Sequence, residues 1–126
     1  MKVLDIYCGV GGLASGFKKA DFEVIGVDIS KDAGRTFKFN KFGSFIQADL
    51  SATPVDGNYD GIIGGPPCKP WSSVNLRRRG KKHKDYSLLL NYFNHIEHHL
   101  PAFFLLENVP PITIHSVNLL STNAQK

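Results

Sequence analysis

Short apolar runs and stretches of helical period alternate along the first third of the chain. Val3–Tyr7 is predicted to be a buried strand that ends in a glycine-rich turn, and Leu13–Ala20 is predicted to be a helix. Glu23–Asp28 is the second predicted strand, and Ser30 is a suitable N-cap for a helix that extends to about Asn40. The order strand, helix, strand, helix is therefore established early.

The same alternation continues in the rest of the chain. Three more strands are predicted, at Ser44–Ala48, Tyr59–Ile63 and Ala102–Leu106. Asp85 is the predicted cap of a helix that Pro101 closes. The apolar residues of this helix recur at helical spacing and are expected to form its buried face: Leu89, Tyr92, Phe93, Ile96 and Leu100.

Strands that alternate with helices imply a parallel sheet with right-handed crossovers. The expected class is α/β, with five strands in the doubly wound order 3-2-1-4-5. In this order the first and fourth strands are neighbours, and their carboxyl ends form the crevice where such folds bind ligands. Residues that follow these strands are the first candidates for function.

Composition limits the class of protein. The chain has 126 residues, of which 42% are hydrophobic and 21% charged, enough apolar material for one compact domain. No apolar run approaches the roughly 18 residues needed to cross a bilayer, and Asp5 interrupts any signal region, so no membrane contact and a cytoplasmic location are expected. The two cysteines, Cys8 and Cys68, form neither a disulfide framework nor a metal-ligand spacing. Cys8 is expected to pack in the core.

Positive charge is concentrated in one segment. The net charge is +4, but six cations lie within eight positions, and the other nine cations face eleven anions. This basic run predicts contact with a polyanion, although a solvated loop is the alternative. Its members are Arg77, Arg78, Arg79, Lys81, Lys82 and Lys84.

A glycine turn at Gly9, Gly11 and Gly12 joins the first strand to the first helix, where backbone can closely approach a nucleotide-like ligand. With Asp28 at the end of the next strand, it fits a dinucleotide fingerprint and an S-adenosylmethionine loop equally well. The alternative is a tight helix-strand packing contact without a ligand.

The fourth predicted strand leads into Gly64-Gly65-Pro66-Pro67-Cys68, which places one cysteine between prolines at the crevice. A thiolate there could attack an electron-poor ring carbon, whereas an ordinary lone cysteine is a small buried apolar residue. The fifth strand ends at Glu107, so a carboxylate is expected next to the cysteine loop. Alone, Glu107 would be a solvated residue at a strand end.

Taken together, these segments resemble the DNA cytosine-5 methyltransferase family from Met1 to about Val109. Pro67-Cys68 resembles the catalytic loop of that family, and Glu107-Asn108-Val109 resembles its acid motif. The resemblance implies that S-adenosylmethionine is the cofactor, with Asp28 at its ribose, Asp49 and Leu50 at its adenine, and Tyr7 against the adenosyl group. The implied cofactor-binding residues are Asp5, Tyr7, Gly9, Gly11, Gly12, Asp28, Ile29, Asp49, Leu50 and Pro66.

The resemblance also implies a reaction. Cys68 adds to ring carbon 6 of a flipped-out cytosine while Glu107 engages ring nitrogen 3, so that carbon 5 accepts the methyl group of the cofactor. Pro67 and Asn108 complete the implied catalytic set, in which Asn108 supports the loop that carries Cys68. The implied DNA contacts are Ser72, Arg77, Arg78, Arg79, Lys81, Lys82 and Lys84.

Residues 1–109 match the N-terminal part of the family's catalytic domain, and residues 110–126 form a divergent C-terminal tail. Complete members continue with an arginine motif, a target-recognition domain and a returning C-terminal helix, and no counterpart of these is found in the sequence. The expected fold is therefore an incomplete Rossmann-like methyltransferase fold of about five parallel strands.

The leading hypothesis is a truncated or split methyltransferase whose partners are DNA and a complementary C-terminal polypeptide that carries the target-recognition domain. The alternative is a non-catalytic remnant or subunit that binds nucleic acid or a partner protein. A dehydrogenase fragment would explain the glycine turn but not Pro67-Cys68, and methylation of cytosine in RNA is a further variant. His95, His98 and His99 have metal-like spacing, but without a second cluster they are expected on the solvent face, and no metal is expected.

Overall fold

The computed structural model describes residues 1–51, 54–66 and 86–107, with the side chain of residue 86 left out. These residues form one five-stranded parallel sheet and three helices. The strands are β1 (Lys2–Ile6), β2 (Glu23–Asp28), β3 (Ser44–Gln47), β4 (Gly61–Gly64) and β5 (Phe103–Leu106), and the helices are α1 (Gly12–Lys19), α2 (Lys31–Phe39) and α3 (Tyr86–His99).

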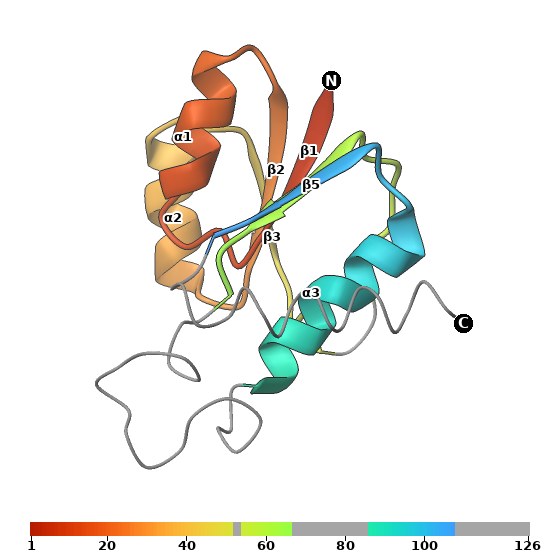
Figure 1. Ribbon diagram of the computed structural model, residues 1–126. Coiled ribbons are helices and arrows are strands. Elements are labelled where there is room, and N and C mark those ends of the chain that lie inside the picture. Colours follow the sequence, from red (N-terminus) through yellow and green to blue (C-terminus); the bar gives the residue numbers. More distant parts are fainter. Residues whose placement is uncertain (52–53, 67–85, 108–126) are drawn as a thin grey trace.

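The order of the strands is β3-β2-β1-β4-β5, which confirms the doubly wound order expected from the sequence. Strand β1 lies in the middle and pairs in parallel with both β2 and β4. Helices α1 and α2 cover one face of the sheet, and α3 covers the other (Figure 1). The carboxyl ends of all five strands therefore point to the same edge.

The predicted elements are all present, and their ends lie within two residues of the expected ones. The expected cap of α2 is confirmed, because the hydroxyl of Ser30 accepts a hydrogen bond from the backbone N–H of Ala33 at 3.2 Å. Strand β4 begins two residues later than expected, at Gly61. The hydroxyl of Tyr59 donates a hydrogen bond to the carbonyl oxygen of Asp56, so Tyr59 belongs to the turn before the strand.

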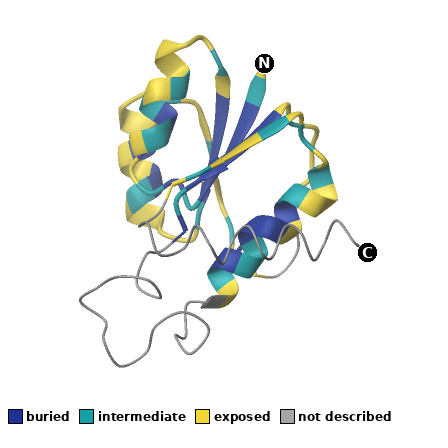
Figure 2. Ribbon diagram, viewed as in Figure 1, coloured by how far each residue is buried: buried dark blue, intermediate teal, exposed yellow. Residues whose placement is uncertain are grey.

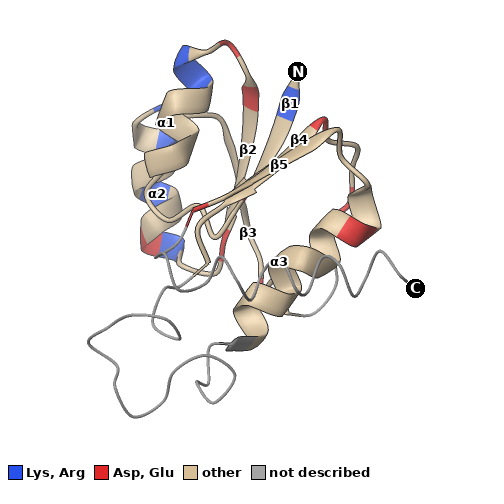
Figure 3. Cartoon of the chain, viewed as in Figure 1, with Lys and Arg blue, Asp and Glu red and all other residues tan. Residues whose placement is uncertain are grey.

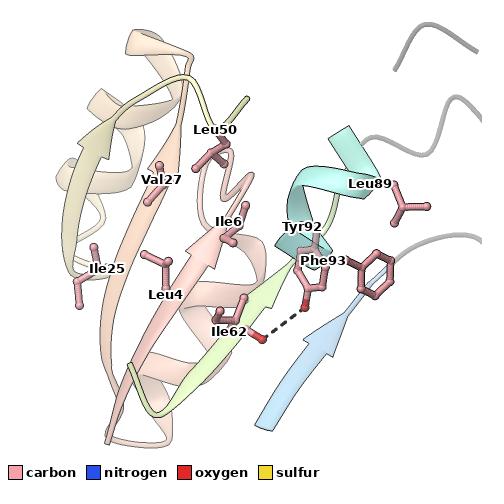
Figure 4. Close-up of a cluster of buried hydrophobic side chains, with 9 residues drawn as sticks. All are labelled: Leu4, Ile6, Ile25, Val27, Leu50, Ile62, Leu89, Tyr92 and Phe93. Carbon is pink, nitrogen blue, oxygen red and sulfur yellow. Dashed lines mark hydrogen bonds between the residues drawn. The ribbon is translucent and has the colours of Figure 1, made fainter. Parts of the chain in front are cut away.

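The larger apolar cluster lies between the sheet and α3 (Figure 4). In this cluster the buried hydroxyl of Tyr92 donates a hydrogen bond of 2.8 Å to the carbonyl of Leu105 and lies 3.4 Å from that of Ile62. One side chain of α3 therefore contacts the backbone of both β4 and β5. The cluster consists of Leu4, Ile6, Ile25, Val27, Leu50, Ile62, Leu89, Tyr92 and Phe93.

A second cluster fills the opposite face, under α1 and α2. Phe37 of α2 is fully buried there, and Cys8 is a free, buried thiol, as expected. Val3, Ala14, Val24 and Ile63 complete the cluster.

Two expectations for α3 are wrong. Leu100 is 82% exposed, because the helix ends at His99 and Leu100 has a left-handed φ of 46° that turns its side chain away from the buried face. His95 is 1% exposed instead of lying on the solvent face, and its Nδ1 lies 2.7 Å from the carbonyl oxygen of Asn91. A carbonyl can only accept, so Nδ1 carries the proton, and burial lowers the pKa of the ring.

The sheet is not covered evenly. Figure 2 shows that β1 is buried, whereas the edge strand β5 is largely exposed or half-buried. Phe104 and Leu105 are 41% and 40% exposed in the described part of the chain, although both are large apolar residues. No helix among the described residues is long and apolar enough to cross a membrane.

A glycine in β2 is expected to be required by packing. Gly26→Ala should lower the free energy of unfolding by about 1–3 kcal/mol, because a Cβ there would lie 2.7 Å from the ring of Phe37 and 2.9 Å from the sulfur of Cys8. Gly16→Ala is the matched control, since its Cβ would meet nothing within 4 Å on the exposed side of α1. This control should gain up to about 1 kcal/mol from helix propensity. Urea denaturation followed by circular dichroism measures both, and equal stability of the two variants would contradict the packing.

Candidate active site

A residue at or just after the carboxyl end of each strand lies at the same edge of the sheet. Tyr7 follows β1, Asp28 ends β2, Asp49 lies just after β3, Gly65 follows β4 and Glu107 follows β5. Figure 3 shows acidic positions at these carboxyl ends and Lys and Arg positions along α1 and α2. This edge is where open parallel sheets bind ligands.

The turn after β1 requires glycine. Gly11 has a φ of 103°, and a Cβ there would also overlap the ring of Phe42, so both its backbone conformation and the available space exclude a side chain. The turn is tied to β2, because the backbone N–H of Cys8 donates to the carbonyl of Val27 at 3.1 Å. Gly12 then begins α1, so the amino end of this helix faces the site.

The carboxylate of Asp28 is held by the backbone. One oxygen accepts from the N–H of Gly9 and the other from the N–H of Ser30, both at 2.9 Å. These two bonds fix the orientation of the carboxylate across the end of β2 and leave lone pairs on both oxygens free for a hydroxyl donor.

A cavity of about 270 Å³ lies beside Asp28. Its apolar lining suits a flat ring system, and Asp49 adds a carboxylate whose pKa is lowered by hydrogen bonds from the hydroxyl and N–H of Ser51. The hydroxyl of Tyr7 donates to the carbonyl of Leu88 at 2.8 Å, which closes one wall with α3. Burial raises the pKa of Tyr7 to about 12, so it stays a donor. The lining residues are Tyr7, Asp28, Ile29, Ala48, Asp49, Leu50, Gly65 and Leu88.

A second cavity, of about 180 Å³, shares Tyr7 and Gly65 with the first and reaches the start of α1. Asp5 lies in its wall and is only 1% exposed. Neither carboxylate oxygen of Asp5 has a hydrogen-bond partner among the described residues. Burial raises the pKa of Asp5 to about 7, and the charge of Asp28 adds to this rise. The second cavity therefore contains a carboxyl group whose protonation changes near neutral pH.

Glu107 lies at the other end of the second cavity. Its backbone N–H donates to the carbonyl of Gly64 at 2.9 Å, which continues the pairing of β5 with β4 beyond the last strand residue. A Cβ on Gly65 would lie 3.0 Å from the carboxylate of Glu107. The absence of a side chain at Gly65 thus lets this acid lie against the end of β4.

Several predicted site residues lie together in the described structure, and others fall outside it. Asp5, Tyr7 and Gly12 contact the cavities, as do Asp28, Ile29, Asp49, Leu50 and Glu107. Gly9 and Gly11 shape the turn next to them, and Pro66 is buried directly after Gly65. Outside the described residues lie Pro67, Cys68, Ser72, Arg77, Arg78, Arg79, Lys81, Lys82, Lys84 and Asn108.

Three residues that line the first cavity are not expected from the sequence, and Cys8 and Leu13, which line the second cavity, are not expected there either. Leu88 contributes through its backbone carbonyl, which has no signature in a side-chain pattern. Ala48 is an ordinary small residue after a strand. Gly65 was part of a recognised motif, and its role next to Glu107 depends on strand pairing between β4 and β5.

Comparisons with known proteins agree with this geometry. The model of the family described as C-5 cytosine-specific DNA methylase matches residues 1–125. The type II methyltransferase M.FnuDI of Fusobacterium nucleatum is 36% identical over 117 residues, which cover 86% of this chain and 32% of the relative. M.NgoPII of Neisseria gonorrhoeae is 36% identical over 114 residues, with 86% and 33% covered. The chain spans about a third of the length of these curated relatives.

Solved structures show the same fold at low sequence identity. The PH0226 protein of Pyrococcus horikoshii OT3 matches with a TM-score of 0.60 and 24% identity, over 85% of this chain and 48% of that one. The glycopeptide N-methyltransferase MtfA, solved with S-adenosylmethionine, matches with a TM-score of 0.58 and 19% identity, over 83% and 46%. The described residues therefore share the Rossmann-like fold of these two structures.

The buried carboxyl of Asp5 is expected to make stability depend on pH. Its pKa is about 7 in the folded chain and roughly 3.9 when unfolded, so the unfolded chain ionises first and stability falls as the pH rises from about 4 to 7. Asp5→Asn should remove this loss. The free energy of unfolding of the variant, relative to that of the unaltered chain, should therefore be up to about 4 kcal/mol higher at pH 8 than at pH 4. Denaturant titrations at both pH values measure the difference, with the exposed Asp21→Asn as control. A gain independent of pH would contradict the assignment.

Proposed function

The chain belongs to the C-5 cytosine-specific DNA methylase family, and from this premise we propose that it supplies the cofactor-binding and nucleophile-bearing part of a DNA cytosine-5 methyltransferase. The complete enzyme transfers the methyl group of S-adenosylmethionine to carbon 5 of cytosine in DNA. One observation carries the proposal: a ring-sized cavity and an acid-lined cavity share Tyr7 and Gly65 at the carboxyl ends of β1 and β4.

The residues of the first cavity fit the nucleoside part of the cofactor. Asp28 has oriented carboxylate oxygens with free lone pairs, which suit the two ribose hydroxyls. Ile29 and Leu50 provide apolar walls for adenine, and Asp49 can accept a hydrogen bond from its amino group. The remainder of the cofactor is proposed to lie against the backbone of Gly9, Gly11 and Gly12 and the side chain of Asp5. When bound, the cofactor supplies the methyl group.

The acid-lined cavity fits the second part of the reaction. Glu107 lies against Gly65 and is proposed to hold ring nitrogen 3 of the target cytosine. Cys68 is proposed to add to ring carbon 6, with Pro66 and Pro67 stiffening its backbone and Asn108 supporting the loop. The new bond between sulfur and carbon 6 makes carbon 5 nucleophilic. After methyl transfer, loss of the carbon 5 proton and of the thiolate restores the aromatic ring.

DNA and a complementary polypeptide are the proposed partners. Ser72 and the basic run Arg77, Arg78, Arg79, Lys81, Lys82 and Lys84 are proposed to neutralise DNA phosphates. The chain spans about a third of its relatives, and β5 exposes Phe104 and Leu105 at the edge of the described sheet. These two facts support completion by a polypeptide that carries the target-recognition domain. We also place the protein in the cytoplasm, since a reducing compartment suits the free thiol of Cys8.

Cofactor choice separates a methyltransferase from a nucleotide-dependent dehydrogenase. The chain is expected to bind S-adenosylmethionine in preference to a nicotinamide dinucleotide. Asp28→Ala should weaken S-adenosylmethionine binding about tenfold or more, because hydrogen bonds to a charged carboxylate are lost. Asp21→Asn, at an exposed acid after α1 whose left-handed φ of 65° asparagine tolerates, is the control and should leave the affinity unchanged. Calorimetric titration measures the binding of both ligands to the unaltered chain and of S-adenosylmethionine to the two variants. Tighter binding of the dinucleotide than of S-adenosylmethionine would overturn the assignment.

The nucleophile is tested by covalent trapping. With a complementary C-terminal half supplied, Cys68 should remain attached to DNA that contains 5-fluorocytosine, since fluorine at carbon 5 cannot leave as a proton does. Cys68→Ser should abolish the adduct, and Glu107→Gln should slow it. Cys8→Ser is the control, because that thiol is buried under α1 and α2. Mass spectrometry of the digested adduct locates the linkage, and a cross-link at Cys8 would contradict the mechanism.

A further inference from the structure

Resting on the proposed function, we propose that the hydroxyl of Tyr7 is a positioning group that couples an occupied first cavity to the start of α3. In the sequence, α3 directly follows the segment that carries Cys68 and the basic run. A ligand that fills the cavity therefore also stabilises the helix that follows this segment. Tyr7 acts here through α3 and not through its ring, which lines the cavity in either case.

The backbone conformation of Tyr7 directs its side chain to α3. Leu4 and Ile6 of β1 belong to the cluster under α3 (Figure 4), so an extended backbone would place the next residue, Tyr7, on the opposite face. Tyr7 instead packs against the same cluster as Ile6, because its φ of 57° lies in the left-handed region. Residues other than glycine rarely adopt this conformation, and such strain persists only where the surrounding structure holds it. An uncommon conformation at one residue thus brings the Tyr7 hydroxyl under α3.

The hydroxyl of Tyr7 joins two parts of the cavity wall that are far apart in the chain. It donates a hydrogen bond of 2.8 Å to the backbone carbonyl of Leu88, 81 positions later. Both residues line the first cavity, Tyr7 from the carboxyl end of β1 and Leu88 from the start of α3. Burial raises the pKa of Tyr7 to about 12, so the hydroxyl keeps its proton at neutral pH. A ring without the hydroxyl would line the same cavity but would not hold α3.

The start of α3 depends on such links. The first N–H groups of a helix have no acceptor within the helix, and helix ends fray. One turn further along, the hydroxyl of Tyr92 donates to the carbonyl of Leu105, which fastens that part of α3 to β5. At Leu88 the corresponding link to the sheet is the hydroxyl of Tyr7. Loss of this hydroxyl should therefore loosen the first turn of α3 and leave the rest of the helix attached.

A ligand in the first cavity strengthens the link between Tyr7 and Leu88. It packs against both residues at once and excludes water from the hydrogen bond between them, and a hydrogen bond is electrostatically stronger where water is excluded. Coupling between two sites is reciprocal, so the ligand stabilises the start of α3, and an ordered α3 raises the affinity for the ligand. Direct contact between the ligand and Leu88 is the rival explanation, and it needs no hydroxyl.

Amide hydrogen exchange of the full chain, with and without saturating S-adenosylhomocysteine, tests the coupling. In the unaltered chain the ligand should slow exchange in the peptide Leu88–Phe93 on the order of tenfold. In Tyr7→Phe the slowing should fall to about twofold or less, because the ligand still fills the cavity but the hydrogen bond is lost. Calorimetric titration of each variant establishes that the ligand is bound.

Tyr59→Phe is the matched control. The hydroxyl of Tyr59 also donates a hydrogen bond of 2.8 Å to a backbone carbonyl, that of Asp56, and neither residue lines the first cavity. This variant removes the same kind of hydrogen bond from the same kind of side chain, so it should keep the full slowing at Leu88–Phe93.

The ratio of the exchange rates with and without ligand separates coupling from plain stability. If Tyr7→Phe speeds exchange equally in both states, or keeps the full slowing, the positioning role is overturned. A bound ligand that leaves exchange in Leu88–Phe93 of the unaltered chain unchanged overturns it without any variant. In these cases the cofactor assignment stands. If S-adenosylhomocysteine does not bind to the folded chain, the cofactor assignment itself fails, and the coupling fails with it.

Discussion

The position of β1 between β2 and β4 is the constraint on which the site depends. Its parallel pairing with both neighbours brings the residues after Ile6, the end of β2 and the end of β4 to one edge at a common level. The turn after β1 then reaches Asp28 through the backbone N–H of Gly9, and Gly65 lies against Glu107, which follows β5. A shift of one residue in either pairing would turn the side chains of a strand to the opposite face and separate these groups.

The electrostatics of the site follow from what each acid contacts. Asp28 is satisfied by backbone N–H groups, Asp49 by Ser51, and Asp5 by no described group. Three similar carboxyl groups at the same edge therefore differ in the ligand groups that they can accept. Among the described cations, Lys2 lies in β1, Lys41 follows α2, and the others lie in α1 and α2 (Figure 3).

Much of the fold was predictable because its signals are local. Apolar runs, the Ser30 cap and the glycine turn each act within a few residues, and the strand order then follows from general rules for parallel sheets. The exposure of Leu100 and the burial of His95 were not predictable, since both depend on where α3 ends and how it packs. The contribution of Leu88 is a backbone carbonyl that only the folded chain brings to Tyr7. The pairing of Cys68 with Glu107 stays a prediction, because Cys68 lies outside the described residues.

The exposed strand β5 has a consequence for handling the chain. A parallel strand with large apolar side chains at 40% exposure is a template on which other strands can add. Strand addition is selective for backbone hydrogen bonding and tolerant of sequence, so a second molecule of the same chain competes with any intended partner. We therefore expect self-association through β5 to increase with the concentration of the chain, and to decrease when a polypeptide that covers β5 is produced together with it.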